Sequence, residues 1–334
     1  MTLLDEAQSQ HIVLVAPAGY GKTTLARQWF GRQDRRAVWV RAGPASTDVA
    51  ALAHGLVHAA EDVLQGSGAR LQEHLRTSHS PNTEVPEIAD ILVDDLAGWP
   101  ADLWMVIDDY QHLAREPNAE RLIDALVIRS TIPLFVTSRI RPSWVSAKRL
   151  LYGEVAEFGR NVLAMTHDEA ARAVPTKTDA SVLGGLMALA EGWPAVIGLA
   201  SLVQSPKLLV GDEIPEALHS YFAEELYQEL TTELQWNLTQ LSLSANIDVG
   251  LAQLLFGADG RFVLEEALDR GFLNKEGETY DLHPLLRQFL RSKMADADSG
   301  PRSSTVEIIA CAALRRSAWD EAFALGASSK WESS

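Results

Sequence analysis

A glycine-rich turn near the start of the chain carries a lysine and two threonines in an order typical of phosphate binding. The turn follows apolar residues 13–15 and matches the pattern G-x-x-x-x-G-K-[ST], except that Ala16 stands where the pattern has its first glycine. Backbone N–H groups from Gly19 to Thr24, with the positive end of the following helix, would bind phosphate oxygens. Lys22 would reach the β- and γ-phosphates, and the Thr23 hydroxyl would ligate Mg²⁺. The predicted phosphate loop consists of Pro17, Ala18, Gly19, Tyr20, Gly21, Lys22, Thr23 and Thr24.

Two acidic residues follow a second apolar segment, at a position where open α/β sheets bind their ligands. Residues 103–107 are apolar and lead directly into Asp108 and Asp109, so both carboxylates lie at the carboxyl end of a buried strand. Asp108 would hold Mg²⁺, and Asp109 would orient or deprotonate the attacking water. Acid pairs also cap turns and helices, but beside a phosphate loop we interpret this pair as a Walker B motif.

A further apolar segment, residues 133–137, ends in Ser138 and Arg139. If its strand lies between the two strands described above, Arg139 emerges beside the γ-phosphate and can sense whether that phosphate is present. The alternative is a surface arginine that follows a strand.

The elements that must position these residues alternate between strands and helices. We expect strands at 13–15, 37–40, 103–107, 133–137 and 154–158, helices that begin at Lys22 and after Asp48, a helix through 88–96, and a connector at 66–86. This alternation predicts an α/β fold with a parallel sheet.

Helices dominate the rest of the chain. Thr166 and Glu169 form a capping-box pattern, and further helices are expected at 183–190, 195–203, 216–230, 232–243, 249–256 and 263–270. Residues 272–282 have the pattern of a β-hairpin with Gly277 in its turn, and a helix begins at His283-Pro284. Helices followed by such a hairpin predict a winged-helix domain. Its candidate recognition helix carries three acidic residues and two basic ones, Glu265, Glu266 and Asp269 beside Arg261 and Arg270. This balance of charge argues against DNA binding by the domain.

The composition restricts the class of protein further. The 334 residues carry a formal charge of −16, which opposes non-specific binding to nucleic acid. The single cysteine, Cys311, excludes an internal disulfide framework. The chain lacks an apolar run of membrane-spanning length and the pattern of a signal peptide. We therefore expect a cytoplasmic protein that does not bind membranes.

Five motifs in a fixed order resemble the STAND class of signal-transduction ATPases, in the branch of the MalT and LuxR-type bacterial activators. The resemblance covers residues 11–295. The motifs are Ala-Gly-Tyr-Gly-Lys-Thr-Thr at 18–24, Val-Ile-Asp-Asp-Tyr at 106–110, Val-Thr-Ser-Arg at 136–139, Glu-Gly-Trp-Pro at 191–194 and Leu-His-Pro-Leu-Leu-Arg at 282–287.

The resemblance implies ATP or ADP as the nucleotide, and a five-stranded sheet with the Arg139 strand between the phosphate-loop and Walker B strands. Lys22, Asp109 and Arg139 would be the catalytic residues. Pro194 would pack near the adenine, and His283 would contact the β-phosphate of ADP, although a packed or capping histidine is an equal alternative. ADP would hold a resting form, ATP and an inducer would open it for self-association, and slow hydrolysis would reset it.

The resemblance also divides the chain into a P-loop domain (1–162), a helical lid domain (163–210), a winged-helix domain (211–297) and a helical pair (298–334) that would begin a superhelical arm. We expect the chain to be part of a longer protein that contacts DNA only through a domain outside these residues.

Two other functions stay open on the motifs alone. A small-molecule P-loop kinase needs an arginine-bearing lid, for which Arg139, Arg141 and Arg149 are available. An AAA-like motor ATPase needs an arginine finger, which the sequence does not identify.

Overall fold

The computed structural model describes residues 2–32, 35–78, 81–174, 190–202, 222–228, 230–295 and 299–316, with isolated positions at 184, 187–188, 220, 318–319 and 323. The chain forms two compact units, Met1–Leu163 and Ala164–Ser334. The finer division into four domains stays a prediction.

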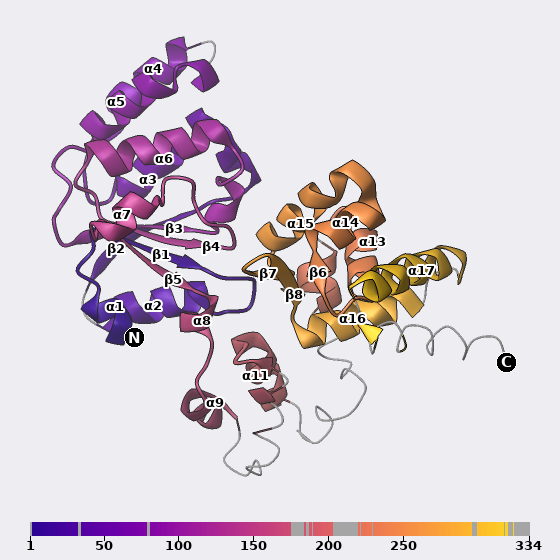
Figure 1. Cartoon of the computed structure of the whole chain (residues 1–334). Helices are drawn as coiled ribbons and strands as arrows, with labels where there is room; N and C mark the ends of the chain where they lie inside the picture. Colours follow the sequence, from indigo (N-terminus) through magenta and orange to yellow (C-terminus); the bar gives the residue numbers. More distant parts are fainter. Residues whose placement is uncertain are drawn as a thin grey trace. The chain divides into compact units, whose positions relative to one another are not determined.

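The first unit is built on a five-stranded parallel sheet (Figure 1). Its strands occur in the spatial order β2-β3-β4-β1-β5, so β4 lies between β1 and β3 as predicted. The strands are β1 (His11–Val15), β2 (Arg36–Arg41), β3 (Leu103–Asp108), β4 (Leu134–Ser138) and β5 (Val155–Gly159).

The central strands are apolar on both faces because helices cover both sides of the sheet. In β1, Val13 packs into the core beneath α3, α5 and α6, whereas Ile12 and Leu14 pack against α1 and α2 on the other face. Figure 1 shows these helices on the two sides of the sheet. The helices of this unit are α1 (Thr2–Glu6), α2 (Lys22–Arg32), α3 (Val49–Ala60), α4 (Ala69–Thr77), α5 (Val85–Asp95), α6 (Pro117–Arg129), α7 (Ala147–Leu151) and α8 (Arg160–Leu163).

The expected connector at 66–86 is wrong, because α4 occupies its centre. Leu71 is the buried residue of this helix, so the apolar pattern is too sparse to indicate a helix. Contacts with α5 stabilise α4 instead. The Leu71 N–H donates to the Asp95 carboxylate at 2.9 Å, and Arg70 pairs with Asp94 at 2.9 Å.

The second unit contains the arrangement of a winged-helix domain, as predicted. A three-stranded antiparallel sheet in the order β6-β8-β7 packs with α13, α14, α15 and α16, and Gly277 lies in the turn between β7 and β8 with φ of 61°. The elements of this unit are α9 (His167–Ala173), α11 (Pro194–Leu202), a π-helical turn (Phe222–Tyr227), α13 (Thr232–Leu241), β6 (Ile247–Asp248), α14 (Val249–Phe256), α15 (Gly260–Asp269), β7 (Leu273–Glu276), β8 (Thr279–Leu282), α16 (Pro284–Ala295) and α17 (Ser299–Arg315).

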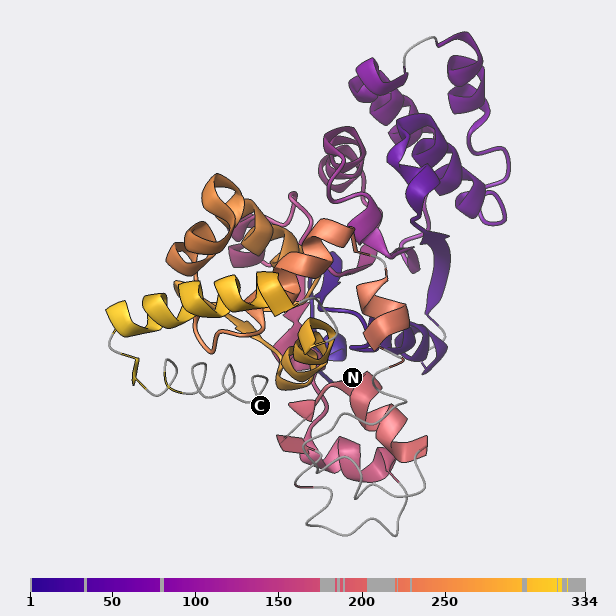
Figure 2. The same cartoon turned by 90° about the vertical axis from the view of Figure 1, so that its right-hand side faces the viewer.

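Helix α17, yellow in Figure 2, packs on α14 through Ile309 and Leu251. Most of the helix expected at 183–190, the start of the one expected at 216–230 and most of the second helix of the C-terminal pair lie outside the described residues. In the described part of the chain, no helix has both the length and the apolar character needed to cross a membrane.

His11, the first residue of β1, gives a pH-dependent prediction. Its side chain is 2% exposed, and its Nδ1 accepts a hydrogen bond from the Leu134 N–H at 3.3 Å. Burial lowers the pKa of His11 to about 4, with a smaller contribution from the positive charge of Arg149. Between pH 6.5 and 4 the unfolded chain therefore binds a proton that the folded unit does not, so stability is full above pH 6.5 and falls as the pH falls.

We expect the first unit to lose about 2 kcal/mol more stability in the wild type than in His11→Asn between pH 6.5 and 5. Asparagine preserves an acceptor for Leu134 and does not titrate. Hydrogen exchange of β1 and β4 peptides in increasing urea measures the free energy of this unit separately from the second. The exposed His112, changed to asparagine, is the matched control. Equal pH dependence in wild type and His11→Asn would contradict the prediction.

Candidate functional site

The phosphate-loop residues form a tight turn between β1 and α2. Gly19 and Gly21 have φ of 76° and 71°, a region that side-chain-bearing residues rarely adopt. Helix α2 begins at Lys22, so its first backbone N–H groups are directed toward the turn. Ala16 is buried and is not in this left-handed region, which explains why alanine can replace the first glycine of the pattern.

Lys22 is held inside the loop that it follows. Its Nζ donates to the carbonyl oxygens of Ala16 at 2.7 Å and Pro17 at 2.9 Å, and the residue is 9% exposed. Burial lowers the pKa of Lys22 to about 8 and the charge of Arg139 adds to this effect, whereas the two aspartates act in the opposite direction. At pH 7 the ammonium group is therefore still protonated and can bind an anion.

The remaining loop residues divide between interior and surface. Tyr20 is buried, and its hydroxyl accepts a hydrogen bond from Arg160 Nε of α8 at 2.7 Å. Thr24 is exposed, and Ala18 is half-buried. Tyr20 thus anchors the loop to α8.

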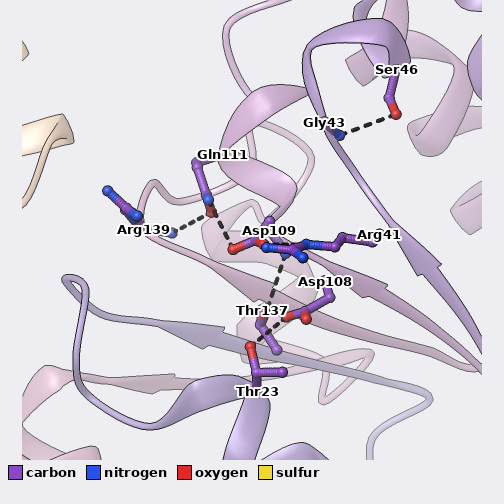
Figure 3. A network of polar contacts seen from close by, with 9 residues as sticks. All are labelled: Thr23, Arg41, Gly43, Ser46, Asp108, Asp109, Gln111, Thr137 and Arg139. Atoms are coloured by element: carbon purple, nitrogen blue, oxygen red, sulfur yellow. Dashed lines mark hydrogen bonds and ion pairs between the residues drawn. The ribbon is translucent and has the colours of Figure 1, made fainter. Parts of the chain in front are cut away.

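Asp108, the last residue of β3, joins the ends of three elements (Figure 3). Its Oδ1 accepts hydrogen bonds from Thr23 Oγ1 at 2.7 Å and from Thr137 Oγ1. Thr23 lies in the first turn of α2, and Thr137 lies near the end of β4. A carboxylate and a hydroxyl oxygen next to a phosphate loop fit Mg²⁺, which prefers hard oxygen ligands and shares them with phosphates.

Asp109 adopts a left-handed conformation, with φ of 59° and ψ of 38°. Figure 3 shows Arg41 and Gln111 on either side of its carboxylate. Arg41 Nε lies 3.1 Å from Oδ2, and Gln111 Nε2 donates to Oδ1 at 3.1 Å. Burial acts to raise the pKa of Asp109, but the hydrogen bonds from Gln111 and Arg41 outweigh it and hold that pKa below its ordinary value. Both oxygens are therefore positioned, and the group is a weak base.

Arg139 follows β4 at the same edge of the sheet. Its backbone N–H donates to Gln111 Oε1 at 3.2 Å, and its charge affects the pKa values of both Lys22 and Asp109. In Figure 3 its side chain extends away from Asp108 and Thr23. The structure thus places Lys22, Thr23, Asp108, Asp109 and Arg139 at one edge of the sheet, and their roles in binding and catalysis stay predictions.

The other two predicted site residues, Pro194 and His283, lie in the second unit. Pro194 is the first residue of α11. His283 is 4% exposed, its Nδ1 accepts from the Leu285 N–H at 3.3 Å, and its Nε2 lies 3.1 Å from the Ala190 carbonyl oxygen. Because Nδ1 is an acceptor, the proton is on Nε2 and is donated to Ala190. The roles of Pro194 at the adenine and of His283 at a phosphate stay predictions.

The bend between Ala190 and α11 depends on Gly192. Its φ is 75°, and a Cβ at this position would lie 2.8 Å from the Met165 carbonyl oxygen. Trp193 is buried beside it, and its ring contacts His283 at a centroid distance of 4.9 Å. Within the second unit, the Glu-Gly-Trp-Pro motif therefore forms a packed corner against the winged helix.

Three residues of the site were missed by the sequence analysis: Arg41, Gln111 and Thr137. The signal for Arg41 is its place at the end of β2, where it pairs in register with Asp108. The signal for Thr137 is its place as the last residue of the predicted strand 133–137, directly before Ser138 and Arg139. Gln111 lies in a 3₁₀ turn after Asp109, and its role depends on a backbone conformation that no pattern indicates.

Comparisons with known proteins agree with this architecture. Residues 223–302 match the family described as the MalT winged helix domain. The HTH-type transcriptional regulator MalT of Vibrio cholerae is 27% identical over 315 residues, and MalT of Yersinia pestis is 26% identical over 310 residues. Both alignments cover 87% of this chain but only 34% of the relative. The chain thus spans about a third of the length of these relatives.

A solved structure supports the fold independently. A Walker-type ATPase of Pyrococcus abyssi aligns with a TM-score of 0.54 and 14% identity, covering 86% of this chain and 93% of its own. The resemblance drawn from the five motifs is confirmed by the relatives and the winged-helix match. The chain is thus similar to MalT over most of its length and has the fold of the P-loop ATPases.

Proposed function

We propose that the chain is the nucleotide-dependent switch of a transcriptional regulator. The observation that carries this proposal is the junction of Lys22, Thr23 and Asp108, which joins a phosphate loop to a carboxylate suited to Mg²⁺. Bound Mg²⁺ would neutralise phosphate charge, while the loop N–H groups and Lys22 would hold the β- and γ-phosphates. ATP and ADP are the nucleotides that the MalT-like resemblance implies.

The geometry around Asp109 fits slow hydrolysis. A general base must accept a proton from the attacking water, and a carboxylate with both oxygens already bound to Gln111 and Arg41 does this poorly. Slow turnover suits a timer that returns an active ATP form to a resting ADP form. In this proposal, the ATP form self-associates in the cytoplasm when an inducer is present.

Two arginines that a kinase lid would need are engaged elsewhere in the first unit. Arg141 pairs with Glu157 at 2.8 Å, and Arg149 pairs with Asp124 at 2.8 Å. This favours the regulatory switch over the small-molecule kinase. DNA contact is assigned to a part of the longer regulator outside these residues, because Glu266 and Arg270 of the candidate recognition helix pair with each other at 3.7 Å.

The direct test is to identify the nucleotide that purified protein carries. We expect denatured wild type to release close to one ADP per chain and Lys22→Ala to release none, because this substitution removes the cation that holds the phosphates. Chromatography of the released nucleotide measures both. Lys148→Ala removes an exposed lysine from the same unit and is the matched control. Normal ATP affinity in folded Lys22→Ala would refute the proposed site.

A second substitution tests hydrolysis separately from binding. Asp109→Asn preserves the size and polarity of the side chain but removes the carboxylate that would act on water. We expect nucleotide affinity to change less than about threefold and single-turnover hydrolysis to slow by roughly 10²- to 10⁴-fold. Asp102→Asn, which changes an exposed acid before β3, controls for lost charge. An unchanged hydrolysis rate in Asp109→Asn would show that another group acts on the water.

A further inference from the structure

A pocket of about 500 Å³ lies between α2 and the edge strand β2, and Asp108 is one of the residues that line it. Its wall from α2 includes Arg27 and Phe30, three positions apart on one face of the helix. Its floor comes from Ala37, Trp39 and Arg41, the alternate residues of β2 that share one face of the strand. The pocket is therefore built by regular elements of the first unit.

Two of the guanidinium groups in this pocket retain donors for a ligand. Arg41 is 82% exposed and makes a described ion pair with Asp109 through its Nε, which leaves its terminal amino groups available. Arg27 lies over the Trp39 ring at 5.9 Å, and among the described residues it has no carboxylate partner. Arg35, also in the wall, is committed to Asp5 at 3.3 Å.

The aromatic part of the wall offers a flat apolar surface beside these charges. Trp39 is 37% exposed, and the Phe30 ring contacts it edge-on at a centroid distance of 6.1 Å. A pocket of this size is larger than a bare inorganic ion needs and lies within the range of small-molecule sites. Paired guanidinium groups are best suited to the oxygen atoms of phosphates and carboxylates.

We propose that this pocket binds a small molecule with a flat apolar body and an oxyanion group, with the oxyanion between Arg27 and Arg41 and the body against Trp39 and Phe30. The ligand class is an aromatic phosphate monoester or carboxylate. The binding site itself does not depend on the chain being an ATPase.

The position of the pocket predicts an effect on the nucleotide site, and this part rests on the proposed function. Arg27 lies one helical turn after Thr23, and Arg41 lies beside Asp108 in the sheet. An oxyanion on the terminal amino groups of Arg41 would bind the same guanidinium group that holds Asp109 through its Nε, and would therefore fix or shift that group. Occupancy of the pocket would therefore change the rate of ATP hydrolysis by altering how Asp109 is held.

Calorimetric titration of the full chain, saturated with ADP and Mg²⁺, tests the site with phenyl phosphate and benzoate as probes. We expect saturable one-site binding of at least one probe, weakened at least tenfold in Arg27→Gln and in Arg41→Gln. Arg36→Gln is the matched control, because Arg36 lies on the opposite face of β2 and pairs with Asp102 at 3.6 Å. Preference for phenyl phosphate or benzoate identifies the oxyanion as phosphate or carboxylate.

Three results would overturn the proposal. The first is no saturable binding of either probe, and the second is equal binding by wild type and Arg27→Gln. The third is displacement of ADP by the probe, because it would place the probe in the nucleotide site. Repeating the titration without nucleotide separates the two claims. If the chain proves not to bind ADP but the probe still binds through Arg27, the proposed switch fails and the oxyanion site stands.

Discussion

A buried carboxylate at the end of β3 is the constraint on which the first unit depends. Asp108 is only 6% exposed, and a charge removed from water destabilises the fold unless hydrogen bonds compensate it. Thr23 and Thr137 provide those bonds, and both reach Asp108 because β3, β4 and β1 are neighbours in the sheet. The hydrogen bonds that stabilise this acid therefore also hold the Thr23 hydroxyl next to its carboxylate, beside the predicted phosphate loop.

Much of this arrangement could be predicted from the sequence because it follows from apolar strands with polar ends. The parallel sheet brings the carboxyl ends of its strands to one edge, so Lys22, Asp108 and Arg139 meet there without any need to know side-chain conformations. The order of the strands was not derivable from periodicity. It came from the resemblance to a family, and the observed position of β4 agrees with it.

The details that escaped prediction depend on contacts between distant elements. Helix α4 buries little apolar surface and depends on the acids of α5, a relationship that no local pattern shows. Asp109 occupies a left-handed conformation that a non-glycine residue adopts at a cost. Arg41, Gln111 and the Thr137 hydroxyl, which accepts from the Asp109 N–H at 3.3 Å, hold it there. Such a conformation can be recognised only once its partners are in place.

His283 uses both of its ring nitrogens in hydrogen bonds within the second unit. Its only ring N–H is donated to Ala190, and its other nitrogen accepts from Leu285. The phosphate contact that the resemblance implies needs the same N–H, and a single donor cannot serve both acceptors at full strength. Contact with a phosphate would therefore cost one of the contacts between the Glu-Gly-Trp-Pro corner and the winged helix. A ligand that must break an internal hydrogen bond has different affinities for a state that contains this bond and for a state that lacks it. Such a difference in affinity is what allows a ligand to shift a protein between two states.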